Sequence, residues 1–149
     1  MAQVIDRDEA SALDLLGASG VHLHVLPEGA ADASDVIVAA ALLDGERQIR
    51  AEVDIPVPDD VDAGMGAWHV NAVDEIHVVA SGQGIMEFVT VDGIVSIVVG
   101  TGDVVEIHGA EHRYRPLTEQ RWLLRFGGPA DGELLATQTG RAAGPWPTV

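Results

Sequence analysis

The chain has 149 residues, enough for one domain with a sizeable core and too few for two domains of ordinary size. Hydrophobic residues make up 47%, which excludes global disorder, and 24 acidic against 8 basic residues give a net charge of −16. Because so negative a surface repels phosphate backbones and anionic lipids, we expect neither nucleic-acid nor membrane-surface binding. The chain has no cysteine and no lysine, which excludes disulfides, thiolate metal ligands and Schiff-base chemistry.

The first quarter of the chain predicts one helix and one strand. A short helix is expected over residues 6–16, where Asp6 stands three residues before Glu9 and Gly17 follows as a stop. Residues 22–26 then alternate between polar and apolar side chains, which predicts a strand.

The middle of the chain changes to short segments that are rich in β-branched residues. Residues 36–43 fit either a buried helical turn or a strand, and Asp44-Gly45 before an alternating stretch favours a hairpin. The segment 56–66, with prolines, aspartates and glycines, predicts an exposed acidic loop. After this loop, apolar runs separated by glycine-containing turns predict strands at 76–80, 85–91, 94–99, 104–107 and 122–126.

The short, regularly spaced strands indicate an all-β domain, a sandwich or a barrel, that spans residues 1–149. Its end, residues 128–149, carries glycines, prolines and alanines without a period and is predicted to be a loose or surface-draped tail. The amino terminus lacks a basic region followed by an apolar run, and no stretch approaches the length of a membrane span. We therefore expect a cytoplasmic protein.

Polar side chains with metal-binding capacity gather between residues 69 and 77. In an unbroken strand, residues of equal parity share one face, and here that face carries His69, Asn71, Glu75 and His77. The residues between them are mostly apolar, so the opposite face is expected to pack against protein. In a small β-barrel the polar face would line an interior that can hold one small molecule.

Two sets of residues resemble the paired motifs of the cupin superfamily. The first motif is matched by Gly64, His69, Asn71, Glu75 and Gly82, and the second by Gly102, His108 and His112. Within the cupins, residues 64–130 are most similar to the acireductone dioxygenase family. The resemblance implies an all-β cupin double-stranded β-helix, a jelly-roll barrel with a short N-terminal helix and a metal-binding core at about residues 64–127.

The resemblance also implies a divalent metal held by His69, Glu75 and His112. Two histidines and one carboxylate leave open positions for substrate and O₂, as in non-haem Fe(II) oxygenases. Asn71 stands where the family has a second histidine, and its amide can ligate the metal or hydrogen-bond a bound water. Because an amide suits harder ions better than an imidazole does, we expect Fe(II) first, with Ni(II), Mn(II), Co(II) and Zn(II) left open.

Three further residues are candidate catalytic groups. His77 occupies the position of the family's substrate-binding arginine, and His108 that of the proline usual before the last ligand. A neutral imidazole at either position can move a proton near neutral pH. Arg125, within an apolar run, is expected to bind an anionic or enolate oxygen through its planar fork. Whether His22 and His24 face the cavity stays open.

By this resemblance the protein is a metal-dependent dioxygenase that acts with O₂ on a small, oxygen-rich, enediol-like substrate. One alternative is a non-oxidative cupin isomerase, dehydratase or lyase, in which the metal is a Lewis acid. Another is a cupin that binds a ligand without catalysis. The expected partners are a small-molecule substrate and O₂, and the oligomeric state, a homodimer included, stays open.

Overall fold

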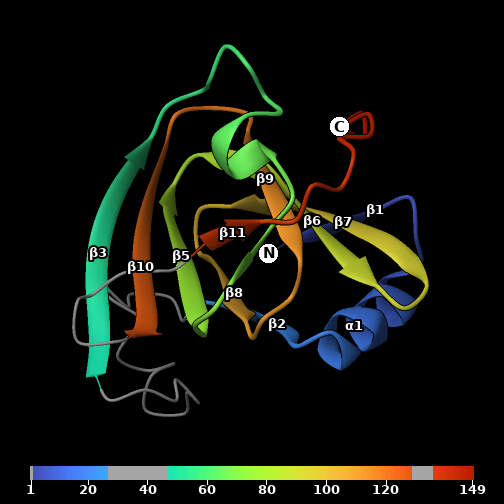
Figure 1. Cartoon of the computed structure of the whole chain (residues 1–149), viewed down its shortest axis with the longest axis horizontal. Helices are drawn as coiled ribbons and strands as arrows, with labels where there is room; N and C mark the ends of the chain where they lie inside the picture. Colours follow the sequence, from blue (N-terminus) through green and yellow to red (C-terminus); the bar gives the residue numbers. More distant parts are fainter. Residues whose placement is uncertain (1, 27–46, 129–135) are drawn as a thin grey trace.

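The structure is a computed structural model that describes residues 2–26, 47–128 and 136–149 (Figure 1). In these residues the chain forms two sheets that enclose an apolar core, with one helix beside them. The all-β fold predicted from the strand pattern is therefore confirmed. Residues 36–43 and the Asp44-Gly45 turn lie outside the described residues, so their predicted elements stay predictions.

Strands pair antiparallel throughout both sheets of the described chain. The first sheet has the order β1 (Gln3–Ile5), β7 (Gly93–Gly100), β6 (Gln83–Thr90), β9 (His112–Pro116), β4 (His69–Asn71) and β11 (Ala136–Gln138). The second has the order β2 (Val21–Val25), β8 (Asp103–Ile107), β5 (Glu75–Ser81), β10 (Gln120–Gly128) and β3 (Arg47–Ile55). Neighbours in these sheets are often far apart in sequence, so the barrel depends on long-range pairing.

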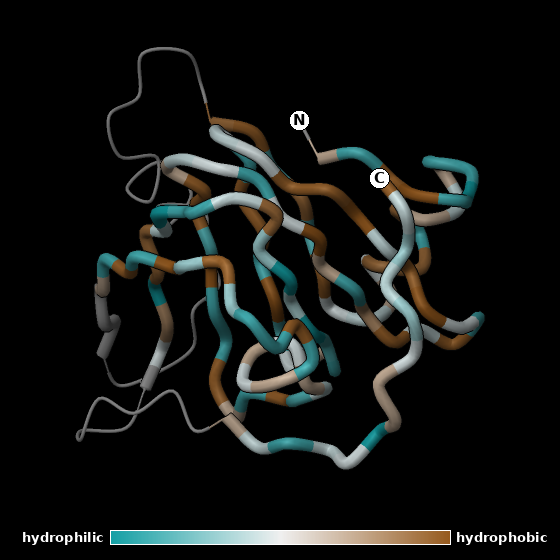
Figure 2. Tube along the Cα trace, turned by 90° about the horizontal axis from the view of Figure 1, so that it is seen from above, coloured by the Kyte–Doolittle hydropathy of each residue, from teal (hydrophilic) through white to brown (hydrophobic). Residues whose placement is uncertain are grey.

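The predicted strands between residues 76 and 126 are all present, as β5, β6, β7, β8 and β10. The hairpin of β6 and β7 turns at Asp92-Gly93, where Gly93 has a φ of 92°, a left-handed conformation that favours glycine. Apolar and polar residues alternate along much of the chain in Figure 2. The core between the sheets includes Met86, Phe88, Ile97, Val99, Val105, Ile107, Tyr114 and Trp122.

The predicted helix is α1 (Glu9–Ala18), and it begins one turn later than the sequence pattern indicates. Its N-cap is Asp8, whose carboxylate accepts a hydrogen bond from the Ser11 backbone N–H at 3.0 Å. Asp6 instead has a φ of 54° in the turn before the helix, so it is not the cap. No helix within residues 2–26, 47–128 and 136–149 is long and apolar enough to cross a membrane.

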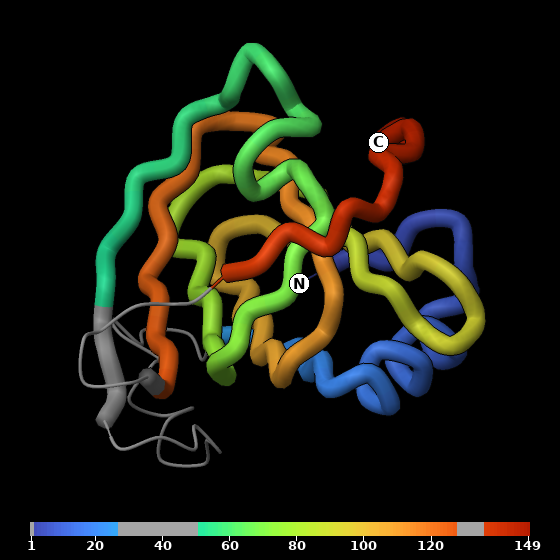
Figure 3. The backbone as a smooth tube through the Cα atoms, in the orientation of Figure 1, coloured from blue at the N-terminus to red at the C-terminus, as the bar shows by residue number. Residues whose placement is uncertain are grey.

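The described part of the C-terminal tail, residues 136–149, is draped over the surface and held there. Strand β11 pairs with β4, and Figure 3 shows the red C-terminal segment crossing the green segment that contains β4. Further along, the Arg113 guanidinium lies over the Trp146 ring at 3.8 Å and over Trp68 at 4.9 Å. Trp146 Nε1 donates to Asp62 at 2.9 Å. These contacts are between residues far apart in sequence, so local composition does not reveal them.

The acidic loop at 56–66 ends in η1 (Gly64–Gly66), a short 3₁₀ turn that leads into β4. A Cβ on Gly66 would lie 1.9 Å from the Val61 carbonyl oxygen, so this tight turn requires glycine. The turn thereby determines where the chain enters β4, the strand that begins at His69.

Candidate active site

The polar stripe predicted on one strand is divided between two strands in opposite sheets. The chain leaves β4 after Asn71 and enters β5 at Glu75, so residues 72–74 cross from the first sheet to the second. His112 begins β9 and pairs directly with His69 across β4 and β9. The structure therefore brings His69, Asn71, Glu75, His77 and His112 together on the wall of one cavity.

His69 and His112 are held in the same way. Each donates from Nδ1 to the carbonyl oxygen two residues earlier, Ala67 and Ala110, at 2.8 Å. A carbonyl only accepts, so Nδ1 carries a proton in each ring, and in a neutral imidazole this leaves the lone pair on Nε2. The two rings are neighbours, with 4.4 Å between centroids. Backbone support at Nδ1 with a free Nε2 is the arrangement of many metal-binding histidines.

Glu75 is completely buried at the centre of the cluster. Its Oε1 accepts a hydrogen bond from Asn71 Nδ2 at 2.7 Å and lies 3.4 Å from His112 Nε2. Its Oε2 lies 3.2 Å from His77 Nε2, without the alignment of a hydrogen bond. Burial raises the pKa of Glu75, but His77, His112 and Asn71 together lower it below the usual value. The side chain is therefore a carboxylate at neutral pH.

The contact between His112 and Glu75 brings two hydrogen-bond acceptors together. Burial lowers the pKa of His112 to about 4, despite the opposing effect of Glu75, so its imidazole is neutral at physiological pH. A lone pair on Nε2 thus faces a carboxylate oxygen with no proton between them. A cation held by these two side chains would remove this repulsion, and a borderline divalent metal would suit the imidazole and carboxylate donors.

The donor chemistry therefore fits a metal, although the side chains are not arranged around one. Within residues 2–26, 47–128 and 136–149, no three His, Asp or Glu side chains are placed so that they could already hold a metal ion. Metal binding at this cluster requires the side chains to adjust.

The cluster forms one polar wall of a cavity of about 360 Å³, large enough for a small molecule. The remaining walls come from both sheets, from η1 and from β11. Most of these lining residues are apolar or aromatic: Val53, Ile55, Met65, Met86, Tyr114, Trp122, Leu124 and Ala136, together with the polar Gln138. A ligand here would have polar groups at the histidine cluster and an apolar remainder.

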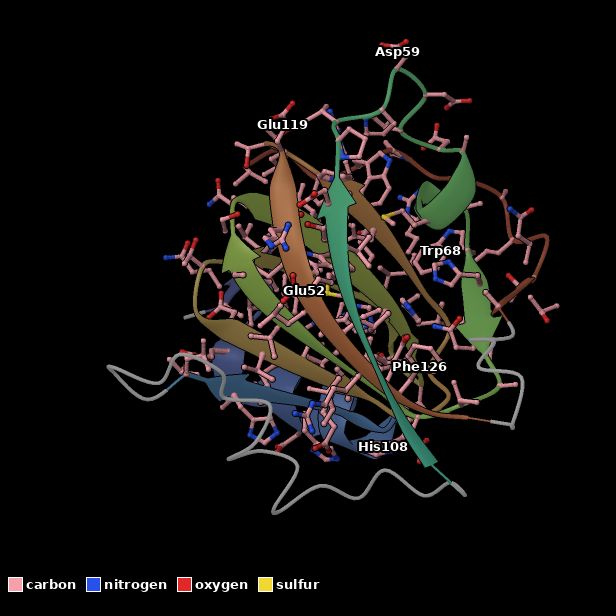
Figure 4. The ribbon with its side chains drawn as sticks, turned by 90° about the vertical axis from the view of Figure 1, so that its left-hand side faces the viewer. Glu52, Asp59, Trp68, His108, Glu119 and Phe126 are labelled. Atoms are coloured by element: carbon pink, nitrogen blue, oxygen red, sulfur yellow. The ribbon has the colours of Figure 1, made fainter. Side chains whose placement is uncertain are left out.

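His108 lies outside the cavity, in a second cluster of histidines and carboxylates. Its Nδ1 lies 3.1 Å from Asp74 Oδ1, and its Nε2 lies 2.9 Å from Glu106 Oε2. Glu106 also lies 3.7 Å from His24 Nε2, and the rings of His22 and His108 are 6.1 Å apart. Figure 4 shows His108 at the end of the molecule opposite Asp59. The structure does not bring His22, His24 or His108 to the cavity wall.

Arg125 is buried, at 4% exposure, but does not line the cavity. Its neighbours Trp122 and Leu124 on β10 do line it. Successive side chains of a strand point to opposite faces, so Arg125 is directed away from the face that Leu124 presents. The apolar run that made Arg125 a candidate is buried or half-buried on both faces of the sheet.

Two aromatic residues on the cavity wall did not emerge from the sequence as candidates. Tyr114 follows His112 by two residues on β9, and burial raises the pKa of its phenol, which therefore stays protonated. Its ring contacts Trp122, with 4.4 Å between centroids. Strand parity after His112 was the signal that could have identified Tyr114, whereas Trp122 reaches the cavity only through pairing of distant strands.

Of the comparisons with known proteins, the one with solved structures supports the fold. No protein-family model and no curated protein matches this sequence. Among solved structures, an acireductone dioxygenase from Bacillus anthracis, with a cadmium ion in its active centre, is similar with a TM-score of 0.57 and 14% identity. The match covers 84% of this chain and 90% of that one. An oxalate decarboxylase from Lactobacillus farciminis matches with a TM-score of 0.49 and 16% identity, over 80% of this chain and 31% of that longer one. The predicted cupin fold is thus confirmed, and the chain has the fold of the acireductone dioxygenase.

Proposed function

We propose that this protein is a metal-dependent cupin enzyme that acts with O₂ on a small, oxygen-rich, enediol-like substrate. The observation that carries the proposal is the buried contact between the neutral His112 imidazole and the Glu75 carboxylate on the wall of a largely apolar cavity. In this proposal His69, Glu75 and His112 hold the metal. Fe(II) is the first candidate, because two histidines and a carboxylate leave positions open for substrate and O₂.

The chain's own residues determine which substrate enters. The described residues that line the cavity include no arginine, and the chain has no lysine. A substrate with several negative charges would therefore lack counter-charges from the protein. The apolar walls formed by residues such as Ile55, Met86 and Leu124 favour a substrate with an apolar part, which they would shield from water. When bound, the metal would supply a site for chelation of two substrate oxygens and for activation of O₂.

The first test is metal binding by the protein purified without added metal. We expect Fe(II), added without oxygen, to bind at one ion per chain and to raise the thermal midpoint of unfolding, since a ligand that binds the folded state stabilises it. His112→Ala should lose both effects. The matched control is His24→Ala, because His24 is a largely exposed histidine of the second cluster. Equal metal content in His112→Ala and the wild type would contradict the proposed site.

The second test separates oxidative from non-oxidative chemistry. The Fe(II)-loaded protein should consume O₂ with candidate enediols that carry an aliphatic tail. Turnover of such substrates under nitrogen would identify an isomerase, dehydratase or lyase instead. A protein that binds these compounds and leaves them unchanged in both atmospheres would be a ligand-binding cupin.

A further inference from the structure

His77 is a buried histidine whose ring nitrogens make no well-aligned hydrogen bond with the described residues, although Nε2 lies near the Glu75 carboxylate. Its side chain is 8% exposed, and its ring stands edge-on to Trp122 with 4.8 Å between centroids. Neither Nδ1 nor Nε2 makes a hydrogen bond within the described chain. Buried polar atoms are nearly always hydrogen-bonded or bound to an ion, because leaving them unpaired costs free energy. His77 therefore points to a partner that the chain does not supply.

The position of His77 beside Glu75 indicates what that partner is. His77 Nε2 lies 3.2 Å from Glu75 Oε2, and this oxygen is also buried without a hydrogen bond. Two atoms that bind one divalent ion at adjacent positions, each at about 2.0–2.2 Å, stand roughly 3 Å apart. The observed spacing suits a nitrogen and an oxygen that share one ion.

The family resemblance implies a metal-binding histidine at position 71, where this chain has Asn71. Its amide nitrogen donates to Glu75 Oε1 at 2.7 Å, and only the NH₂ group can donate to a carboxylate. The amide is therefore turned toward Glu75 and fixes one carboxylate oxygen. The other oxygen, Oε2, is left on the side of His77.

We infer that His77 is a metal ligand, so that an imidazole from β5 replaces the one missing at position 71 on β4, and that Asn71 positions Glu75. This inference rests on the proposed metal site and assigns His77 to ligation instead of proton transfer. The donor set is then His69, Glu75, His77 and His112, three imidazoles and one carboxylate. Such a set is suited to borderline divalent ions.

The test uses Co(II) alone as the probe, because its visible absorption depends on the ligands around it. Affinity is measured by competition with a chelator, and the spectrum is recorded for the wild type and for His77→Gln. A glutamine amide can still donate to Glu75, so this variant keeps that contact if His77 is only a hydrogen-bond donor. We expect the dissociation constant to rise by more than about 100-fold, beyond the 10–100-fold typical of partners outside the ligand set. The Co(II) absorption band should shift as well.

Asn71→Leu, which keeps the number and branching of the side-chain heavy atoms, should weaken binding by about 10–100-fold and leave the Co(II) band in place. His24→Ala is the control and should match the wild type in both measurements. The circular dichroism and thermal midpoint of each metal-free variant verify folding, and His77→Ala replaces His77→Gln if the latter is unfolded.

The outcomes separate the two proposals. A wild-type protein that binds no Co(II), Fe(II) or Mn(II) would overturn the proposed function and the role of His77 together. If the wild type binds Co(II) and the His77 variants bind it equally well with the same spectrum, only the role of His77 is overturned. A shifted band in Asn71→Leu would make Asn71 a ligand and overturn its positioning role.

Discussion

The described part of the molecule has two clusters of histidines and carboxylates in which the pKa of a histidine is shifted in opposite directions. At the cavity, burial lowers the pKa of His112 to about 4. At the opposite end, burial again lowers the pKa of His108, but Glu106 and Asp74 outweigh it and the net pKa is raised. The His112 imidazole is therefore neutral and could donate to a metal, whereas the His108 imidazole is more readily protonated and is already paired with carboxylates. Burial, not residue composition, distinguishes a candidate metal site from a surface ion pair.

The strongest test of this comparison removes one carboxylate from each cluster. Glu75→Gln should weaken Co(II) binding by more than about 100-fold, because it removes a ligand charge that no other side chain at the cavity replaces. Glu106→Gln is the matched change in the second cluster and should leave Co(II) affinity unchanged. Chelator competition measures both. Equal losses in the two variants would show that the clusters are not functionally distinct.

A smaller effect is expected from a backbone change beside the second cluster. Gly20 has a φ of 86°, and a Cβ there would lie 2.7 Å from the His108 carbonyl oxygen. Gly20→Ala should lower the free energy of unfolding by about 1–3 kcal/mol, because alanine rarely adopts this conformation. Urea unfolding measures the loss, and Co(II) affinity per folded molecule should not change. A loss of Co(II) affinity in folded Gly20→Ala would show instead that the second cluster and the cavity are energetically coupled.

The smallest expected effect is a pH dependence from His108. Its pKa in the folded protein is raised, so the stability that it contributes is fully present below the unfolded pKa of about 6.5 and is lost as pH rises through the folded value. The difference in unfolding free energy between the wild type and His108→Gln should therefore shrink over the pH range above about 6.5. A difference that stays constant across this range would mean that His108 does not titrate in the folded protein.

Much of the fold could be predicted from sequence because its signals are local. Apolar runs on either side of the Asp92-Gly93 turn predict the strands β6 and β7. The break between β4 and β5 could not be predicted, since residues 72–74 contain neither glycine nor proline and the chain changes sheet without a local turn signal. The polar residues expected on one face of a single strand therefore lie on two strands, β4 and β5, which meet at the cavity.

The site residues that follow from motif spacing along the chain could be predicted from the sequence. The positions that depend on how side chains pack could not. Motif spacing placed His69, Glu75 and His112, which the structure brings to one cavity wall. Spacing did not indicate that Arg125 turns away from the cavity, because both faces of β10 are apolar near it. Nor did it indicate that His77 would lie beside Glu75 with neither nitrogen hydrogen-bonded within the described chain.

The pairing of β11 with β4 has a consequence for how the cavity opens. Ala136 and Gln138 of β11 complete the cavity wall, yet this strand has three residues, all exposed, and its partner lies far away in sequence. A short exposed strand closed by a long-range contact has a low local free energy of opening. The wall beside the candidate metal ligands therefore depends on contacts just past β11, where the Thr139 N–H donates to the Trp68 carbonyl and Arg141 pairs with Glu111, and on the stacking of Arg113 on Trp146. Detachment of β11 alone would open the cavity while the remaining strands of both sheets stay paired.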